Sequence, residues 1–374
     1  MTKVQTLERF FSERNSSYST KTTYWRSVNY FEKVNEIEIT EALEIAETEE
    51  ENNIRWKNTH LRDWLIQYRE WCYNNYKKAT AQLYLTAITT LFRHYDITVE
   101  KLPYYNTNRA EQSIPINPDE LVDRDVLRLC IDTNNPLLKA IVLFMSSSGI
   151  ARIDVLNLTI GDYLEATKEY HSHMDSVKYA ITDMEDLDVV PEWHLTRQKT
   201  GVQYFTFSSP ESTRAINMYL LTRNETLSKS KPLFDIHPRY FNQLFKDTND
   251  NLGLGLNGQY SRFAPHMLRR YHATQLIEAG ISESKVDLLQ GRKPQSIAYT
   301  SYIKIKPSKM KTEYIEALPF IVIEDIEAVK SELDITKQQL TKKTDEYEQL
   351  NASIQDIYNE LNDMKKRQDI WDQL

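Results

Sequence analysis

The chain has 374 residues, of which 40% are hydrophobic and 27% are charged, a balance typical of globular proteins that fold in water. No apolar run reaches the roughly 18 residues that a membrane-spanning helix needs, and the N-terminus lacks the pattern of a signal peptide. The two cysteines, Cys72 and Cys130, are too few for a disulfide framework or a Cys-rich zinc site. We therefore expect a cytoplasmic protein that holds no metal.

The formal net charge of −8 is unevenly distributed along the chain. Residues 321–374 hold 7 Lys and Arg against 13 Asp and Glu, whereas residues 254–320 hold 10 against 5. Phosphate binding depends on a local basic surface more than on the charge of the whole chain. The acidic total therefore does not exclude a nucleic-acid-binding protein.

Residues 1–103 are predicted to form a helical domain. Apolar residues recur at helical spacing over 20–34, 60–76 and 80–94. In the last two segments the predicted core positions are Trp64, Tyr68, Trp71, Leu83, Leu85, Ile88 and Leu91. Residues 104–118 contain three Asn and two Pro and show no apolar period, which indicates a linker.

A second domain is predicted over residues 119–320, and its first notable residue is Arg152. Helical segments end where Ser146, Ser147, Ser148 and Gly149 are expected to break the helix. Arg152 follows this turn at the head of a short helix. Local sequence also allows a surface arginine paired with Asp154.

A β-hairpin is predicted from residues 190–195 and 202–207, which are rich in β-branched and aromatic side chains. The turn between them is basic and carries Lys199. Lys199 could reach a ligand from this rigid support, or it could be an ordinary solvated lysine.

A helix predicted from Pro265 to Gly280 places His266 and Arg269 one turn apart near its N-terminus, where the helix dipole favours an anion. Alternatively, His266 caps its own helix and Arg269 forms a salt bridge. Arg292 follows Gly291, and Tyr302 comes ten positions later, with Tyr299 as a rival. Arginine, histidine and tyrosine together suit phosphodiester chemistry, because guanidinium groups hold the phosphate and a phenol oxygen attacks it.

These segments resemble the conserved boxes of the tyrosine recombinases, the phage-type integrases. The segment PHMLRRYHATQLIEAG resembles the His-x-x-Arg box, LLQGRKPQSIAYTSYI the box with the nucleophilic tyrosine, and SSSGIARIDVLNLTIGDY the first-arginine box. The hairpin with Lys199 lies where the family keeps its lysine. All four stand in the family's order over residues 119–320, and the wording GRKP is most similar to the archaeal and archaeal-virus branch.

The resemblance implies a fold, an activity and a set of catalytic residues. The fold would be mainly α with a small β-hairpin, a helical core-binding domain preceding a catalytic domain. Arg152 and Arg269 would clamp the scissile phosphate, Lys199 would protonate the leaving oxygen, and His266 would assist proton transfer. Tyr302 would form a 3′-phosphotyrosyl link, and Arg292 stands where many members have His or Trp. No cofactor is implied, and the expected partners are double-stranded DNA and three further copies of the chain.

The tail, residues 321–374, shows seven-residue spacing from Ile326 to Leu361, which predicts a coiled coil or a single long helix. It would serve self-association or a partner.

The sequence as a whole allows two functions of different class: a site-specific DNA recombinase, or an inactive DNA-binding scaffold derived from an integrase. A nicking topoisomerase with the same chemistry is a third.

Overall fold

A computed structural model describes residues 2–107, 115–223, 226–292 and 306–324. The chain divides into two compact units, Met1–Asn117 and Pro118–Leu374. The predicted coiled coil lies outside the described residues. Within the described part of the chain, no helix is both long and apolar enough to cross a bilayer.

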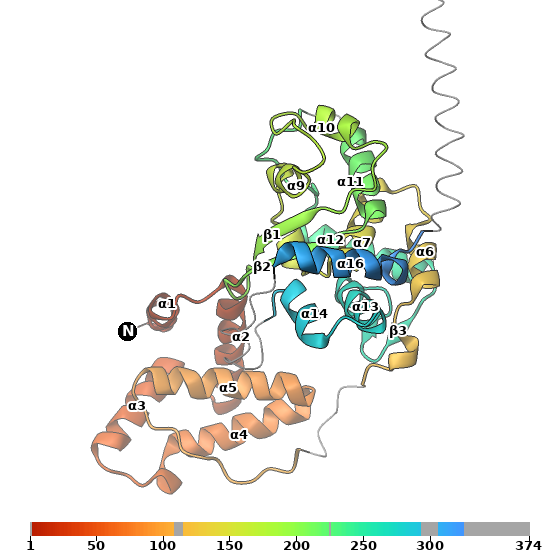
Figure 1. Ribbon diagram of the computed structural model, residues 1–374. Helices are drawn as coiled ribbons and strands as arrows, with labels where there is room; N and C mark the ends of the chain where they lie inside the picture. Colours follow the sequence, from red (N-terminus) through yellow and green to blue (C-terminus); the bar gives the residue numbers. More distant parts are fainter. Residues whose placement is uncertain (1, 108–114, 224–225, 293–305, 325–374) are drawn as a thin grey trace, which may run out of the picture. The chain divides into compact units, whose positions relative to one another are not determined.

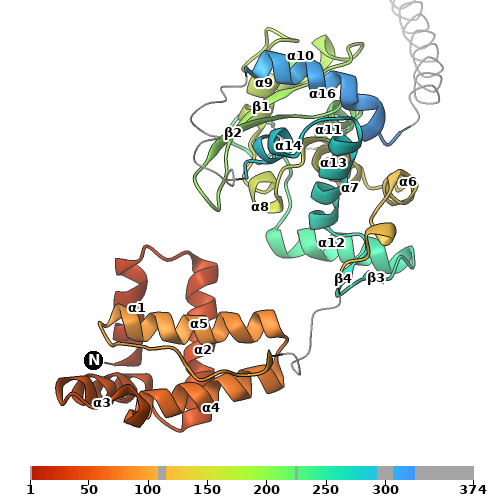
Figure 2. The same cartoon turned by 60° about the horizontal axis from the view of Figure 1, so that its bottom comes forward.

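The first unit is a set of helices around one apolar core (Figure 1). The helices are α1 (Lys3–Glu13), α2 (Tyr18–Asn35), α3 (Ile39–Glu51), α4 (His60–Asn75) and α5 (Lys78–His94), with a 3-10 turn η1 (Trp56–Asn58). Figure 2 shows α4 and α5 running side by side, and α2 packs against both. Tyr68 of α4 is fully buried and shares a hydrogen bond with the Ser27 hydroxyl of α2.

One core position predicted in this unit is wrong. Leu83 is 52% exposed, whereas Leu85 and Ile88 are buried as predicted. The inner face of α5 is formed by buried residues at helical spacing, among them Ala81, Tyr84, Leu85, Ile88 and Leu91. Leu83 lies two positions before Leu85, so its side chain points to the opposite side of the helix.

The second unit surrounds a central helix, α7, with further helices and a small antiparallel sheet (Figures 1 and 2). Its elements are η3 (Pro118–Glu120), α6 (Arg124–Ile131), α7 (Pro136–Ser148), α8 (Arg152–Val155), α9 (Ile160–Ala166), α10 (Val177–Asp183), β1 (Glu192–Thr196), β2 (Gln203–Phe207), α11 (Pro210–Thr222), α12 (Pro238–Asn251), β3 (Leu256–Asn257), β4 (Tyr260–Ser261), α13 (Pro265–Glu278), α14 (Glu283–Leu289) and α16 (Pro307–Ile321). The predicted fold, mainly α with a β-hairpin, is confirmed.

Helix α7 has a capping residue at each end and a largely apolar sequence between them. Asn135 caps it by accepting from the backbone N–H of Leu138, and Pro136 occupies the first turn. Gly149 ends it in the left-handed conformation, with φ 63°. Helices α11 and α13 pack on its sides, which is why nearly every residue of α7 is buried.

The break predicted over Ser146–Gly149 is confirmed at Gly149, whereas the three serines before it still belong to α7. The serine hydroxyls remain satisfied inside the core by donating to carbonyls of the preceding turn. Ser147 Oγ bonds the Leu143 oxygen at 2.7 Å, and Ser148 Oγ bonds the Phe144 oxygen at 2.6 Å. The turn is made by Gly149 alone.

The hairpin pairs β1 with β2 from Glu192–Phe207 to Thr196–Gln203. Phe207 joins a core cluster with residues of α13, α14 and α16, including the fully buried Tyr314. Tyr314 also donates through its hydroxyl to the Ser147 oxygen at 2.8 Å. The sheet, α7 and α16 are thereby fixed to one another.

Candidate active site

Arg152 is presented by the turn at Gly149 and the short helix α8. The Arg152 guanidinium donates through Nη1 to Asn242 Oδ1 at 3.1 Å and to the Pro238 oxygen at 3.4 Å, both in α12. The alternative of a pair with Asp154 is wrong for this conformation, because Asp154 accepts from the backbone N–H of Gln198 at 2.9 Å.

Arg269 projects from the first half of α13 into the interior and is 5% exposed. Its Nη1 donates to the Gly149 oxygen and its Nη2 to the Gln290 oxygen, each at 2.5 Å. The partners are carbonyls, so the salt-bridge alternative is not what the fold adopts. Burial, and then the nearby Arg197 and Arg292, lower the pKa of Arg269 to about 10, which leaves it charged at neutral pH.

His266 lies one turn before Arg269, and its side chain is largely exposed. It does not cap its helix, and its Nε2 accepts from Arg270 Nε at 3.3 Å. Loss of solvent on its inner side, followed by the charges of Arg270, Arg269 and Arg292, lowers its pKa. A neutral imidazole at neutral pH can accept a proton, as a general base requires.

Arg152, His266 and Arg269 line one cavity of about 250 Å³. The other lining residues are Ile150, Ala151, Asn242, Ala264 and Pro265, and none of the eight is acidic. The N-terminus of α13 opens here without a side-chain cap. The guanidinium groups of Arg152 and Arg269 and the N-terminus of α13 make this cavity suited to an anion such as a phosphodiester.

Lys199 lies in the turn between β1 and β2 with an exposed side chain, and it does not line this cavity. The turn itself is held. Asp154 accepts from the Gln198 backbone, and Arg197 donates through Nη1 to the Gly291 oxygen at 2.9 Å. The structure therefore fixes the base of the hairpin to α8 and to the end of α14, and leaves the Lys199 side chain free to reorient.

Arg292 is also outside the cavity. Its half-exposed guanidinium pairs with Asp287 at 3.1 Å. Tyr302 and Tyr299 lie outside the described residues. The fold thus brings three of the predicted residues together, whereas Lys199 and Arg292 lie outside the cavity on separate supports.

Behind Arg269 lies a buried network that was not predicted from the sequence. Gln290 Nε2 donates to the Arg269 oxygen at 2.9 Å and to His272 Nδ1 at 3.0 Å. His272 is fully buried, and burial followed by Arg269 and Arg292 lowers its pKa to about 3. A Cβ on Gly149 would lie 2.4 Å from the His272 ring. Gln290 is the C-cap of α14, directly before Gly291, and no local sequence signal marks it as part of this network.

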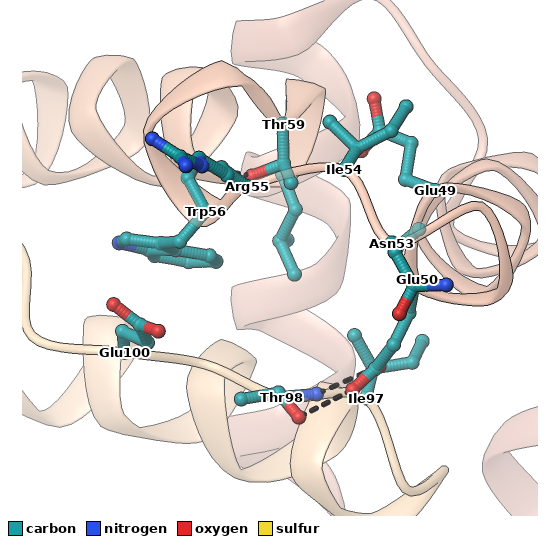
Figure 3. A pocket seen from close by; sticks show the side chains of 12 residues that line it. Glu49, Glu50, Asn53, Ile54, Arg55, Trp56, Thr59, Ile97, Thr98 and Glu100 are labelled. Carbon is teal, nitrogen blue, oxygen red and sulfur yellow. Dashed lines mark hydrogen bonds between the residues drawn. The ribbon is translucent and has the colours of Figure 1, made fainter.

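A second cavity, of about 290 Å³, lies in the first unit and differs in charge (Figure 3). Its lining includes Glu49, Glu50 and Glu100. Glu50 accepts from the backbone N–H and the hydroxyl of Thr98, and Glu49 accepts from the backbone N–H of His60. These carboxylates would repel a phosphate and already brace the loop, so the cavity is not a candidate for phosphodiester chemistry. Among the described residues, no group of three or more His, Cys, Asp or Glu could hold a metal ion.

Comparison with solved structures identifies the fold. The chain is similar to a lambda integrase tetramer bound to a Holliday junction, with TM-score 0.51 and 14% identity over 79% of this chain and 75% of that one. It is similar to a lambda integrase dimer bound to a COC′ core site, with TM-score 0.51 and 14% identity over 82% of this chain and 100% of that one. It is also similar to the Tn1549 transposon integrase in complex with circular intermediate DNA, with TM-score 0.50 and 12% identity over 90% of this chain and 100% of that one.

These likenesses show the fold, which matches that of the tyrosine recombinases. Residues 131–309 match the model of the phage integrase family. All four boxes lie within these matched residues. The comparison with curated proteins gives no match.

Proposed function

We propose that this protein is a site-specific DNA recombinase that cleaves and rejoins strands through a 3′-phosphotyrosyl intermediate. The observation that carries the proposal is the convergence of Arg152, His266 and Arg269 on one cavity without an acidic wall, inside a phage integrase family domain. Arg152 and Arg269 hold the scissile phosphate, and their charge-assisted hydrogen bonds strengthen as negative charge builds on its oxygens.

Proton transfers fall to the residues around this clamp. Tyr302 attacks phosphorus, and its phenolic proton passes to His266, whose lowered pKa keeps it able to accept. Lys199 gives a proton to the leaving 5′-oxygen after the hairpin turn closes on DNA. Arg292 donates to the phosphate in place of the His or Trp of many family members.

The remaining assignments rest on sequence and resemblance. Residues 1–103 are proposed as a core-binding domain that clamps DNA, 104–118 as a linker, 119–320 as the catalytic domain and 321–374 as a long helix or coiled coil. The protein acts as a tetramer on double-stranded attachment sites in the cytoplasm, and the tail adds a coiled-coil contact. The residue sequence Arg292-Lys293-Pro294 favours the archaeal or archaeal-virus branch.

The test uses full-length protein and a pool of nicked duplexes with a randomised core. A nick next to the cleaved bond lets the released fragment diffuse away and traps the adduct. We expect a denaturation-resistant protein–DNA adduct enriched in one sequence, and rejoining when a strand with a 5′-hydroxyl is added. DNA binding without any adduct would instead identify an inactive scaffold. Relaxation of supercoiled DNA without sequence preference would identify a topoisomerase.

A further inference from the structure

The anion cavity has one polar lining side chain that the proposed chemistry does not use, Asn242. It comes from α12 and accepts from Arg152 Nη1 at 3.1 Å. Arginine has only donors, so the acceptor is the amide oxygen. The amide NH₂ group of Asn242 has no partner among the described residues.

Arg152 depends on this contact in a way that Arg269 does not. Arg269 is buried and gripped by two carbonyls at 2.5 Å. Arg152 is only partly buried and stands on a four-residue helix, and its other hydrogen bond within the described residues is to the Pro238 oxygen at 3.4 Å. A long side chain held by so few groups samples many rotamers unless a neighbour fixes it.

The support behind Asn242 is rigid. Pro238 occupies the first turn of α12, and His237 caps the helix. Phe241 is fully buried and stacks on Phe245 with ring centroids 5.3 Å apart. Asn242 also holds the guanidinium without cancelling its charge, which a carboxylate at this place would do.

We propose that Asn242 is a positioning residue, which holds the Arg152 guanidinium in the cavity that it shares with His266 and Arg269. This inference rests on the proposed recombinase function. It gives α12, a helix that lies outside all four sequence boxes, a part in the active site.

The experiment measures single-turnover adduct formation on the DNA sequence selected from the randomised pool. Asn242→Ala removes the acceptor and is expected to slow cleavage about tenfold, the order of one hydrogen bond to a charged group. Asn242→Asp keeps an acceptor but places a carboxylate beside the phosphate, and is expected to slow cleavage about a hundredfold. DNA affinity should change less than about twofold, since most binding energy comes from other phosphate contacts.

A double-mutant cycle separates positioning from a general structural effect. In an Arg152→Lys background, which lacks the guanidinium fork, Asn242→Ala should have no further effect on rate. Gln243→Glu is the matched control, because it adds a negative charge at the next, exposed position of α12 outside the cavity. It should cleave at the wild-type rate.

Wild-type cleavage by Asn242→Ala, or an equal slowing in the Arg152→Lys background, would overturn the inference while leaving the proposed function intact. Failure of the wild type itself to form an adduct would reject the proposed function and this inference together.

Discussion

At the scale of single residues, Gly149 joins the end of α7 to the arginine clamp. Its φ of 63° is a conformation that favours glycine, its oxygen accepts from Arg269, and its Cα faces the His272 ring. We expect Gly149→Ala to destabilise the second unit by about 3 kcal/mol, from backbone strain and the collision with the buried ring. Hydrogen exchange of the α7 and α13 amides in urea would measure this.

Gly253→Ala is the control for this prediction. Gly253 has φ 62°, but no atom lies within 4 Å of its added Cβ. It should cost only the backbone strain, about 1 kcal/mol. Equal losses at both positions would show that contact with His272 does not matter.

His272 gives a pH prediction of definite sign. Its pKa is lowered to about 3 in the fold, against an ordinary value of 6.5. The unfolded chain therefore binds an extra proton between these values, so the stability that neutral His272 allows is present above pH 6.5 and is lost as the pH falls. The slope is about 1.4 kcal/mol per pH unit.

The measurement is the difference in unfolding free energy between wild type and His272→Phe from pH 7 to pH 4.5. Wild type should lose stability relative to the variant as the pH falls. Buried Glu211, whose pKa is raised to about 7 by burial, slopes the opposite way but is common to both proteins and cancels. A pH-independent difference would contradict the assignment.

Sequence predicted the residue types of the site better than their surroundings. Arg152, His266 and Arg269 line one cavity, and local signals such as Gly149 and Pro265 predicted the helix ends that present them. The partners of these residues come from distant segments, and single positions such as Asn242 and Gln290 carry no periodic signal. Contacts across 90 residues, such as Arg152 to Asn242, arise only when the helices pack.

At the scale of elements, the hairpin that carries Lys199 is held through its base. Asp154 is buried, and burial raises its pKa while its Oδ1 accepts from the Gln198 backbone. Asp154→Ala should speed exchange of the Gln198 amide about tenfold or more, since a hydrogen bond to a charged group is lost. Asp154→Asn retains an acceptor and should be closer to wild type. Unchanged exchange in Asp154→Ala would mean that the turn is held by Arg197 alone.

The strands and helix starts were predictable because local patterns define them. β-branched and aromatic residues predicted the hairpin, and Pro265 marked the first turn of α13. The break predicted over Ser146–Gly149 falls on Gly149, the last of these residues, and the serines stay helical for a tertiary reason. Serine favours turns when its hydroxyl competes with the backbone, but inside α7 the hydroxyls bond the preceding carbonyls and the helix continues.

At the scale of the whole molecule, the last described residues, 307–324, are anchored to the second unit. The buried Glu211 carboxylate accepts from the Ile323 and Glu324 backbone N–H groups at 3.0 and 2.8 Å. Arg128 Nε donates to the Ile323 oxygen at 2.6 Å. Because residues 307–324 are anchored to the unit, removal of residues 325–374 should leave its fold intact.

We therefore expect a chain ending at Glu324 to show a lower oligomeric state in light scattering without DNA, and to keep the ability to form the adduct. The proposed coiled coil is the physical reason for the lower state. If the truncated chain showed the same oligomeric state as the full chain, the tail would have no role in self-association. Loss of folding on truncation would contradict the anchoring at Glu211.

The central claim is that a tyrosine of the last box becomes covalently linked to DNA under the Arg152 and Arg269 clamp. The most direct measurement is mass spectrometry of the adduct after nuclease and protease digestion, with Tyr302→Phe and Tyr299→Phe in parallel. We expect a nucleotide on Tyr302, an adduct from Tyr299→Phe, and none from Tyr302→Phe. A nucleotide on Tyr299 would show that Tyr299, and not Tyr302, is the nucleophile. If no tyrosine of the wild-type protein carried a nucleotide, the proposed phosphotyrosyl link would be contradicted.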